Sequence, residues 1–329
     1  MTEKYSVPQD REKFLWVRFG SLGDVLQALA SAYLVKKRFP DIKLCFMTRR
    51  EYADVVKSQP YIDKVVLGEK TPNTVLKQTA AMLHEEKFDW IASTFKGAHM
   101  PVLSWLGQVK NRLGDSHYLP FLDTANVYKW AEAHGIDLRS RKEKSCFATE
   151  ESTAFARQIL APLNRKKKIF CVIGASSVEK MWPAEYWIEF LKPLAAKGWS
   201  MVINGYGERE QAVADKIAEN LPDENVLNLV GKLNYVNMIG IASECQIAVG
   251  NDTGPLHLAA LCGIPTVGIF DYIQPVDVGY NMPWLTFAVA REEKLQTFYA
   301  KKRDASVLAE LKPEKVREKF DELAEKFGL

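Results

Sequence analysis

The chain has 329 residues, a length that predicts two domains. Hydrophobic residues make up 47% and charged residues 26%, which is typical of a globular protein with a sizeable core. The formal net charge of +3 is close to balance, so composition gives no reason to expect a nucleic-acid partner. No run approaches the roughly 18–20 apolar residues that cross a bilayer, and the polar N-terminus lacks a signal-peptide core, so we expect a cytoplasmic protein.

Along the first half of the chain, short apolar runs alternate with longer segments of helical periodicity. This alternation is typical of β–α–β units and predicts a parallel sheet. From about residue 150 the chain is helical and charged, and the basic run 164–168 is either a linker or a solvated turn. The strands expected here are residues 14–19, 43–48, 64–68 and 90–94, and the helices are residues 25–39 and 74–87.

A second and more regular series begins at residue 169. Its strands are expected at residues 169–174, 200–205, 226–231, 246–250 and 266–270, and its helices at residues 183–198, 208–221 and 235–245. We therefore predict an α/β protein with two doubly wound domains of similar size. The last stretch, residues 312–329, has an apolar face that we expect to pack on the protein body.

The five cysteines form no CxxC pair, and four of them lie inside apolar runs. We expect buried free thiols in a reducing compartment, and no metal or redox site. The cysteines are Cys45, Cys146, Cys171, Cys245 and Cys262.

Ligands of open α/β sheets bind outside the carboxyl ends of the strands, so the loops that follow strands carry the candidate chemistry. The first such loop is GSLGD, residues 20–24. Gly20 and Gly23 permit a tight turn and close approach to a ligand, but the loop is not GxGxxG, which disfavours a dinucleotide site. Asp24 either caps the following helix or serves as a general base exposed by the loop.

The second loop is GASSVEKMWP, residues 174–183. Its Ser176 and Ser177 hydroxyls and the Lys180 ammonium group are suited to phosphate oxygens, although a loop lysine is often only solvated. The second half of the chain contains two loops suited to an anion, this one and the loop that opens residues 251–263. Together they suggest a bound diphosphate.

The third loop opens the helix of NDTGPLHLAALCG, residues 251–263. Asp252 or Thr253 can cap this helix, Gly254 allows close approach, and the N-terminus is a potential anion site. His257 is either a satisfied core residue or a ligand-facing one.

Together, segments 18–40, 174–183 and 251–270 resemble family 9 glycosyltransferases, the bacterial heptosyltransferases that build the inner core of lipopolysaccharide from ADP-heptose. The resemblance implies a GT-B fold, with two Rossmann-like domains facing across a cleft. It also implies that residues 1–165 bind the acceptor, that residues 166–311 bind the nucleotide sugar, and that the helix 312–329 packs back on the first domain.

The family's motifs assign roles to particular residues. Asp24 matches the general base that activates the acceptor hydroxyl, and Lys180 matches the lysine that binds the donor's phosphates. The remaining donor residues implied are Ser176, Ser177, Asp252, Thr253, Gly254, His257 and, for the ribose, Glu208, with Glu210 as its rival. The acceptor candidates are Gly23, Lys96, His99 and Arg112. The resemblance implies no cofactor and no bound metal ion.

The implied reaction is a single displacement with inversion, from ADP-heptose to a lipid-linked saccharide at the cytoplasmic face of the inner membrane, with transient contact to the membrane surface. Residues 271–280, DYIQPVDVGY, depart from the Gly-Pro and Thr or Ser that are common in the family, which leaves the sugar and base of the donor open. Another nucleotide sugar, a protein acceptor, or a nucleotide-sugar-binding protein without turnover are the alternatives.

Overall fold

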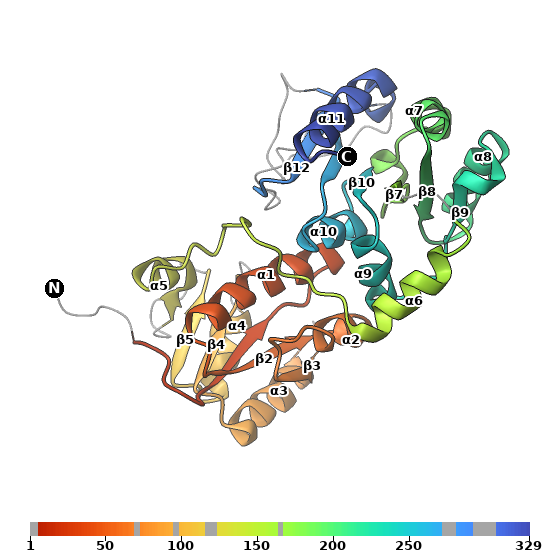
Figure 1. The fold of residues 1–329 in the computed structure, drawn as a ribbon. Coiled ribbons are helices and arrows are strands. Elements are labelled where there is room, and N and C mark those ends of the chain that lie inside the picture. Colours follow the sequence, from red (N-terminus) through yellow and green to blue (C-terminus); the bar gives the residue numbers. More distant parts are fainter. Residues whose placement is uncertain are drawn as a thin grey trace. The chain divides into compact units, whose positions relative to one another are not determined.

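The computed structural model describes residues 6–68, 73–94, 99–115, 124–163, 167–271, 281–291 and 307–329, except the side chains of residues 73–76 and 99–101. The chain divides into two compact units, Met1–Ser140 and Arg141–Leu329. Each unit contains its own six-stranded parallel sheet with helices packed against it (Figure 1). In the described part of the chain, no helix has both the length and the apolar character that a membrane span requires.

The first unit has the strand order β3-β2-β1-β4-β5-β6, with every pair parallel. The chain adds β2 and β3 on one side of β1 and then β4, β5 and β6 on the other side, so the strand order reverses at β1. The elements are β1 (Lys13–Val17), α1 (Leu22–Arg38), β2 (Lys43–Thr48), α2 (Ala53–Lys57), β3 (Lys64–Leu67), α3 (Asn73–Glu86), β4 (Trp90–Ala92), α4 (His99–Leu106), β5 (Asn111–Gly114), β6 (Ala125–Asn126) and α5 (Val127–Ala133).

Both faces of the first sheet are buried, which is why its strands are continuous apolar runs in the sequence. On one face, Leu15 of β1 packs in a cluster with Leu83 of α3 and Leu103 of α4. On the other, the rings of Phe14 and Trp90 stack with centroids 5.8 Å apart, and Trp130 of α5 joins them.

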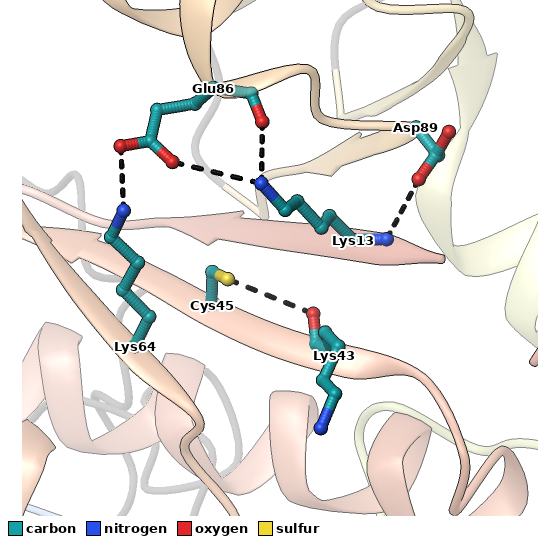
Figure 2. A network of polar contacts seen from close by, with 6 residues as sticks. All are labelled: Lys13, Lys43, Cys45, Lys64, Glu86 and Asp89. Atoms are coloured by element: carbon teal, nitrogen blue, oxygen red, sulfur yellow. Dashed lines mark hydrogen bonds and ion pairs between the residues drawn. The ribbon is translucent and has the colours of Figure 1, made fainter. Parts of the chain in front are cut away.

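A polar network lies at the amino ends of these strands, at the edge opposite the GSLGD loop (Figure 2). Glu86, at the end of α3, forms ion pairs with Lys64 at 2.6 Å and Lys13 at 3.8 Å. The backbone N–H of Lys13 also donates to Asp89, at 2.8 Å. The network joins the starts of β1 and β3 to the end of α3.

The second unit has the strand order β12-β11-β10-β7-β8-β9, again parallel throughout. Its elements are α6 (Glu150–Leu160), β7 (Lys167–Val172), α7 (Ala184–Ala196), β8 (Trp199–Asn204), α8 (Glu208–Glu219), β9 (Val226–Asn228), α9 (Tyr235–Ser243), β10 (Ile247–Asn251), α10 (Gly254–Leu261), β11 (Thr266–Phe270), β12 (Leu285–Val289) and α11 (Pro313–Lys326). The two predicted doubly wound domains are thus confirmed.

The C-terminal helix α11 packs on the second unit. Its Val316, Phe320 and Leu323 belong to the same buried cluster as the inner residues of β7, β8 and α7. The ring of Phe320 lies 5.7 Å from that of Phe190 and 5.5 Å from that of Trp199, centroid to centroid. The sequence predicted that this apolar face packs on the protein body, and that is confirmed. The partner in the structure is the second unit, whereas the resemblance implied the first domain.

The division between the units falls earlier than the expected boundary at 165/166. Helix α6 packs along α9, and the two backbones approach so closely that a Cβ on Gly240 would lie 2.1 Å from the Ser152 carbonyl oxygen. Residues 141–163 therefore belong to the second unit. The basic run 164–168 is described only from Lys167, which starts β7.

Several elements of the first unit were not expected: α2, α4, β5, β6 and α5, and in the second unit β12 was also missed. The strands β5 and β6 have only four and two residues, too few to show a periodic pattern. All five cysteines are buried and free, as predicted.

Candidate active site

Asp24 lies in the first turn of α1, directly after the loop that leaves β1. Its Oδ2 accepts hydrogen bonds from the backbone N–H of Ser21 at 2.9 Å and from the Ser21 hydroxyl at 3.0 Å. Arg18, one residue past β1, places Nη2 2.5 Å from Asp24 Oδ1. A Cβ on Gly20 would lie 2.2 Å from Asp24 Oδ2, so this arrangement requires glycine at position 20.

The surroundings of Asp24 keep it ionised. Partial burial raises its pKa, but the charge and hydrogen bond of Arg18 and the two donors of Ser21 outweigh burial, so the pKa is below its usual value. Both roles expected for Asp24 thus remain compatible: it caps α1, and it offers a half-exposed carboxylate at the carboxyl end of β1. Arg18 was missed by the sequence reasoning, although its position directly after a strand was a signal.

Lys180 and Asp252 form a buried ion pair at the carboxyl ends of the strands of the second sheet, the edge where ligands of open α/β sheets bind and which we call the ligand edge. Lys180 ends the short 3-10 turn Val178–Lys180 after β7, and Asp252 follows β10, the strand that pairs with β7. The Lys180 Nζ lies 2.7 Å from Asp252 Oδ2 and 3.3 Å from the Asp252 carbonyl oxygen. The side chains are 17% and 10% exposed, so little water separates or screens the charges.

His257 faces this pair from α10. Its Nε2 lies 3.8 Å from Asp252 Oδ1, and both side chains are buried. Burial raises the pKa of Asp252, while the nearby His257 lowers it. His257 is thus a buried residue at the polar cluster, and its contact with a ligand stays a prediction.

Asn251 holds the two loops together and was missed by the sequence reasoning. Its Nδ2 donates to the Ile173 carbonyl at 2.7 Å, and its Oδ1 accepts the Trp182 backbone N–H at 3.2 Å. The side chain is fully buried. An asparagine at the end of an apolar strand, next to Asp252, was the available signal.

The N-terminus of α10 has few amide groups to offer. The N–H groups of Leu256 and His257 donate to the Thr253 carbonyl at 3.0 and 3.2 Å, and Pro255 has no N–H. Among the first residues of the helix, the amide of Gly254 is therefore the one that can face an anion, together with the helix dipole.

Of the two candidate glutamates, Glu210 lies at the ligand edge of the sheet. Its Oε1 accepts the Ala175 N–H at 3.2 Å and its Oε2 the Tyr206 N–H at 2.6 Å, so it joins the loops after β7 and β8. Burial raises the pKa of Glu210, and these two amide donors oppose that change. Glu208, at the first position of α8, is exposed.

The other expected site residues are placed less clearly. Ser176 is exposed and Ser177 half-buried in the loop after β7, and Gly23 is buried in α1. Lys96, the His99 side chain and residues 272–280 lie outside the described part of the chain. The Arg112 Nη1 donates to the Val109 carbonyl at 2.9 Å, near the amino end of β5, and contact of Arg112 with the acceptor stays a prediction.

Solved structures share this fold across both units. A family 9 glycosyl transferase from Veillonella parvula has a TM-score of 0.82 and 18% identity, covering 98% of this chain and 100% of that one. The E. coli ADP-heptose lipopolysaccharide heptosyltransferase II has a TM-score of 0.74 and 15% identity, covering 96% of this chain and 100% of that one. The fold is thus GT-B, built from two Rossmann-like domains.

The sequence comparison narrows this class. The model of glycosyltransferase family 9 (heptosyltransferase) matches residues 122–306, more than half of the chain. The chain therefore belongs to glycosyltransferase family 9 and is a glycosyltransferase. Lipopolysaccharide heptosyltransferase 1 of Pseudomonas aeruginosa is 23% identical over 287 residues, covering 80% of this chain and 79% of the relative.

Proposed function

We propose that this chain is an inverting heptosyltransferase that moves heptose from ADP-heptose to a lipopolysaccharide inner-core acceptor of the lipid A–Kdo type. The observation that carries the proposal is the cluster of Lys180, Asp252 and His257 at the start of α10. A relative of similar length is a lipopolysaccharide heptosyltransferase, and an E. coli heptosyltransferase of the same fold has been solved with ADP-2-deoxy-2-fluoro heptose.

On the donor side, Lys180 stabilises the leaving diphosphate. An ammonium group has three donors, and two of them are directed at Asp252, so the third is available to a phosphate oxygen. The Gly254 amide and the dipole of α10 act on the same developing charge. Thr253 and Ser177 offer hydroxyls to the diphosphate, and Ser176 extends this set.

Hydroxyl groups of the donor require acceptors, and the cluster supplies them. Asp252 and His257 are placed to accept or exchange hydrogen bonds with the sugar. For the ribose we favour Glu210 over the Glu208 of the sequence prediction, because Glu210 lies between the loops after β7 and β8. A carboxylate offers about four acceptor positions. Two of those on Glu210 are filled by amides, so the others are available to ribose hydroxyls.

On the acceptor side, Asp24 is the general base. As the acceptor oxygen attacks the anomeric carbon, its proton passes to the Asp24 carboxylate, the bond from the anomeric carbon to the phosphate oxygen breaks, and ADP leaves. Because attack and departure occur on opposite faces of that carbon, the configuration inverts. Gly23 lies beside this base, and Lys96, His99 and Arg112 stay candidates for an anionic acceptor group.

A donor screen by thermal shift, with ADP, UDP and GDP sugars side by side, tests the donor. Stabilisation by ADP-heptose alone is expected, and stabilisation by UDP or GDP sugars without ADP sugars would overturn the assignment. Asp24→Asn is expected to retain donor binding and lose transfer to a lipid A–Kdo acceptor. A chain that binds the donor but transfers to neither this acceptor nor a protein would be a binding protein.

A lipid-linked acceptor also implies transient contact with the cytoplasmic face of the inner membrane. Co-sedimentation with vesicles that carry the acceptor tests this contact, and binding that requires the acceptor is the expected result.

A further inference from the structure

An aromatic side chain stands exposed at the ligand edge of the second sheet. Tyr206, in the loop after β8, is 84% exposed. Among the described residues of this unit, the other exposed large apolar side chains are Val178 and Phe327. Val178 lies in the loop after β7, the strand that pairs with β8. Two of these three exposed side chains therefore occupy neighbouring loops at the edge that carries Lys180 and Asp252.

The loop around Tyr206 is anchored by its backbone and not by its ring. The Tyr206 N–H donates to Glu210 Oε2 at 2.6 Å. Gly205 lies so close to the same carboxylate that a Cβ there would be 2.6 Å from Oε2, and Gly207 has a φ of 85° that favours glycine. The loop thus positions the residue while the ring remains in water, which is unfavourable for a large apolar group unless a ligand covers it.

The order of strands places the polar groups in a sequence. The sheet runs β10-β7-β8, with Asp252 after β10, Lys180 after β7 and Tyr206 after β8. Glu210 lies between the last two, bonded to both loops. Two strand spacings amount to about 10 Å. A nucleotide extended along this edge would place its diphosphate at Lys180, its ribose at Glu210 and its base at Tyr206.

We propose that the Tyr206 ring stacks on the nucleobase of the donor, with Val178 as a second apolar contact, and so contributes to the choice of base. The inference rests on the proposed function, since it requires a nucleotide at this edge. Stacking is effective with every base because each has a π face, and a purine offers the ring more area than a pyrimidine.

Titration calorimetry with ADP, UDP and inorganic pyrophosphate tests the inference on the full chain. Tyr206→Ala is expected to weaken ADP binding about 10-fold, equivalent to about 1.4 kcal/mol, and UDP binding less. Pyrophosphate binding is expected to change less than about 2-fold. Tyr206→Phe keeps the ring and is expected to recover most of the lost affinity, and Phe327→Ala is the control for loss of an exposed ring.

The outcomes separate the two proposals. If Tyr206→Ala binds ADP as the wild type does, or loses pyrophosphate equally, or is not rescued by Tyr206→Phe, the stacking role is overturned. If the wild type binds UDP but not ADP, the assignment of an ADP-sugar donor is wrong, and the stacking role of Tyr206 is then tested by the affinity of the variants for UDP. If the wild type binds no nucleotide, both proposals fail.

Discussion

The ammonium nitrogen of Lys180 lies 2.7 Å from Oδ2 of Asp252, although the two residues are 72 positions apart in the chain. The two charges form an ion pair at a site from which water is largely excluded. A buried pair of this kind is costly to break, since removal of one partner leaves an uncompensated charge. The same pair is central to the proposed donor site, so stability and donor binding can be separated by mutation.

Lys180→Met is expected to lower the free energy of unfolding by about 3–5 kcal/mol, because the Asp252 carboxylate loses its partner. The double variant Lys180→Met with Asp252→Asn removes both charges and is expected to regain part of that stability, but not the affinity for ADP. Urea unfolding and calorimetric titration measure the two effects. A single variant as stable as the wild type, or a double variant with wild-type ADP affinity, would contradict this account.

The Arg18–Asp24 pair predicts a pH dependence. The pKa of Asp24 is lowered in the folded chain, so its contribution to stability is fully present above the unfolded value of about 3.8 and is lost as the pH falls through the folded pKa. Arg18→Gln is expected to raise that pKa and to move the acidic limb of kcat/KM to higher pH. The pH profile of heptosyl transfer measures this, and Arg18→Lys should restore most of the wild-type profile. An unmoved limb would exclude Arg18 as a positioning residue for the base.

Glu210→Gln is expected to lower the free energy of unfolding by about 1–3 kcal/mol, because a glutamine offers one acceptor oxygen where two amides need one each. The pKa of Glu210 is raised in the folded chain, so its proton-linked contribution is present at low pH and is lost as the pH rises through the raised pKa. The stability gap between wild type and variant should therefore narrow as pH rises. Urea unfolding at several pH values measures the gap, and Glu208→Gln, at the exposed neighbouring position, is the matched control. If the stability difference between wild type and Glu210→Gln widened as the pH rises, the pKa of Glu210 would be lowered in the folded chain and not raised.

Gly240→Ala tests whether α6 belongs to the second unit. A Cβ at this position would lie 2.1 Å from the Ser152 carbonyl oxygen, so the helices must separate, at a cost of about 1–3 kcal/mol or more. Urea unfolding measures the loss. Ser243→Ala, at an exposed position of the same helix, should stay within about 0.5 kcal/mol of the wild type. Equal stability of the two variants would mean that α6 and α9 do not pack as described.

Much of the fold was predictable because strands buried on both faces are continuous apolar runs. The strands Lys43–Thr48 and Thr266–Phe270 were predicted to the residue, and α1 was predicted to within a few residues. The middle of the first unit was not predicted, since β5 and β6 are too short for a periodic signal. An amphipathic pattern likewise identified α11 but not its partner, because any apolar surface satisfies such a pattern.

The candidate site divides in the same way. The sequence by itself determined which loops are candidates for a site, since glycines, hydroxyls and charges that follow apolar strands are visible locally. Asp24, Lys180, Asp252 and His257 were named on that ground. Only the tertiary structure decided which of these residues meet. Lys180 reaches Asp252 because β7 pairs with β10, and Glu210 replaces Glu208 at the ligand edge because it is the one held between the loops of β7 and β8. The order of strands in a sheet depends on how the helices pack across it, which no local pattern of residues encodes.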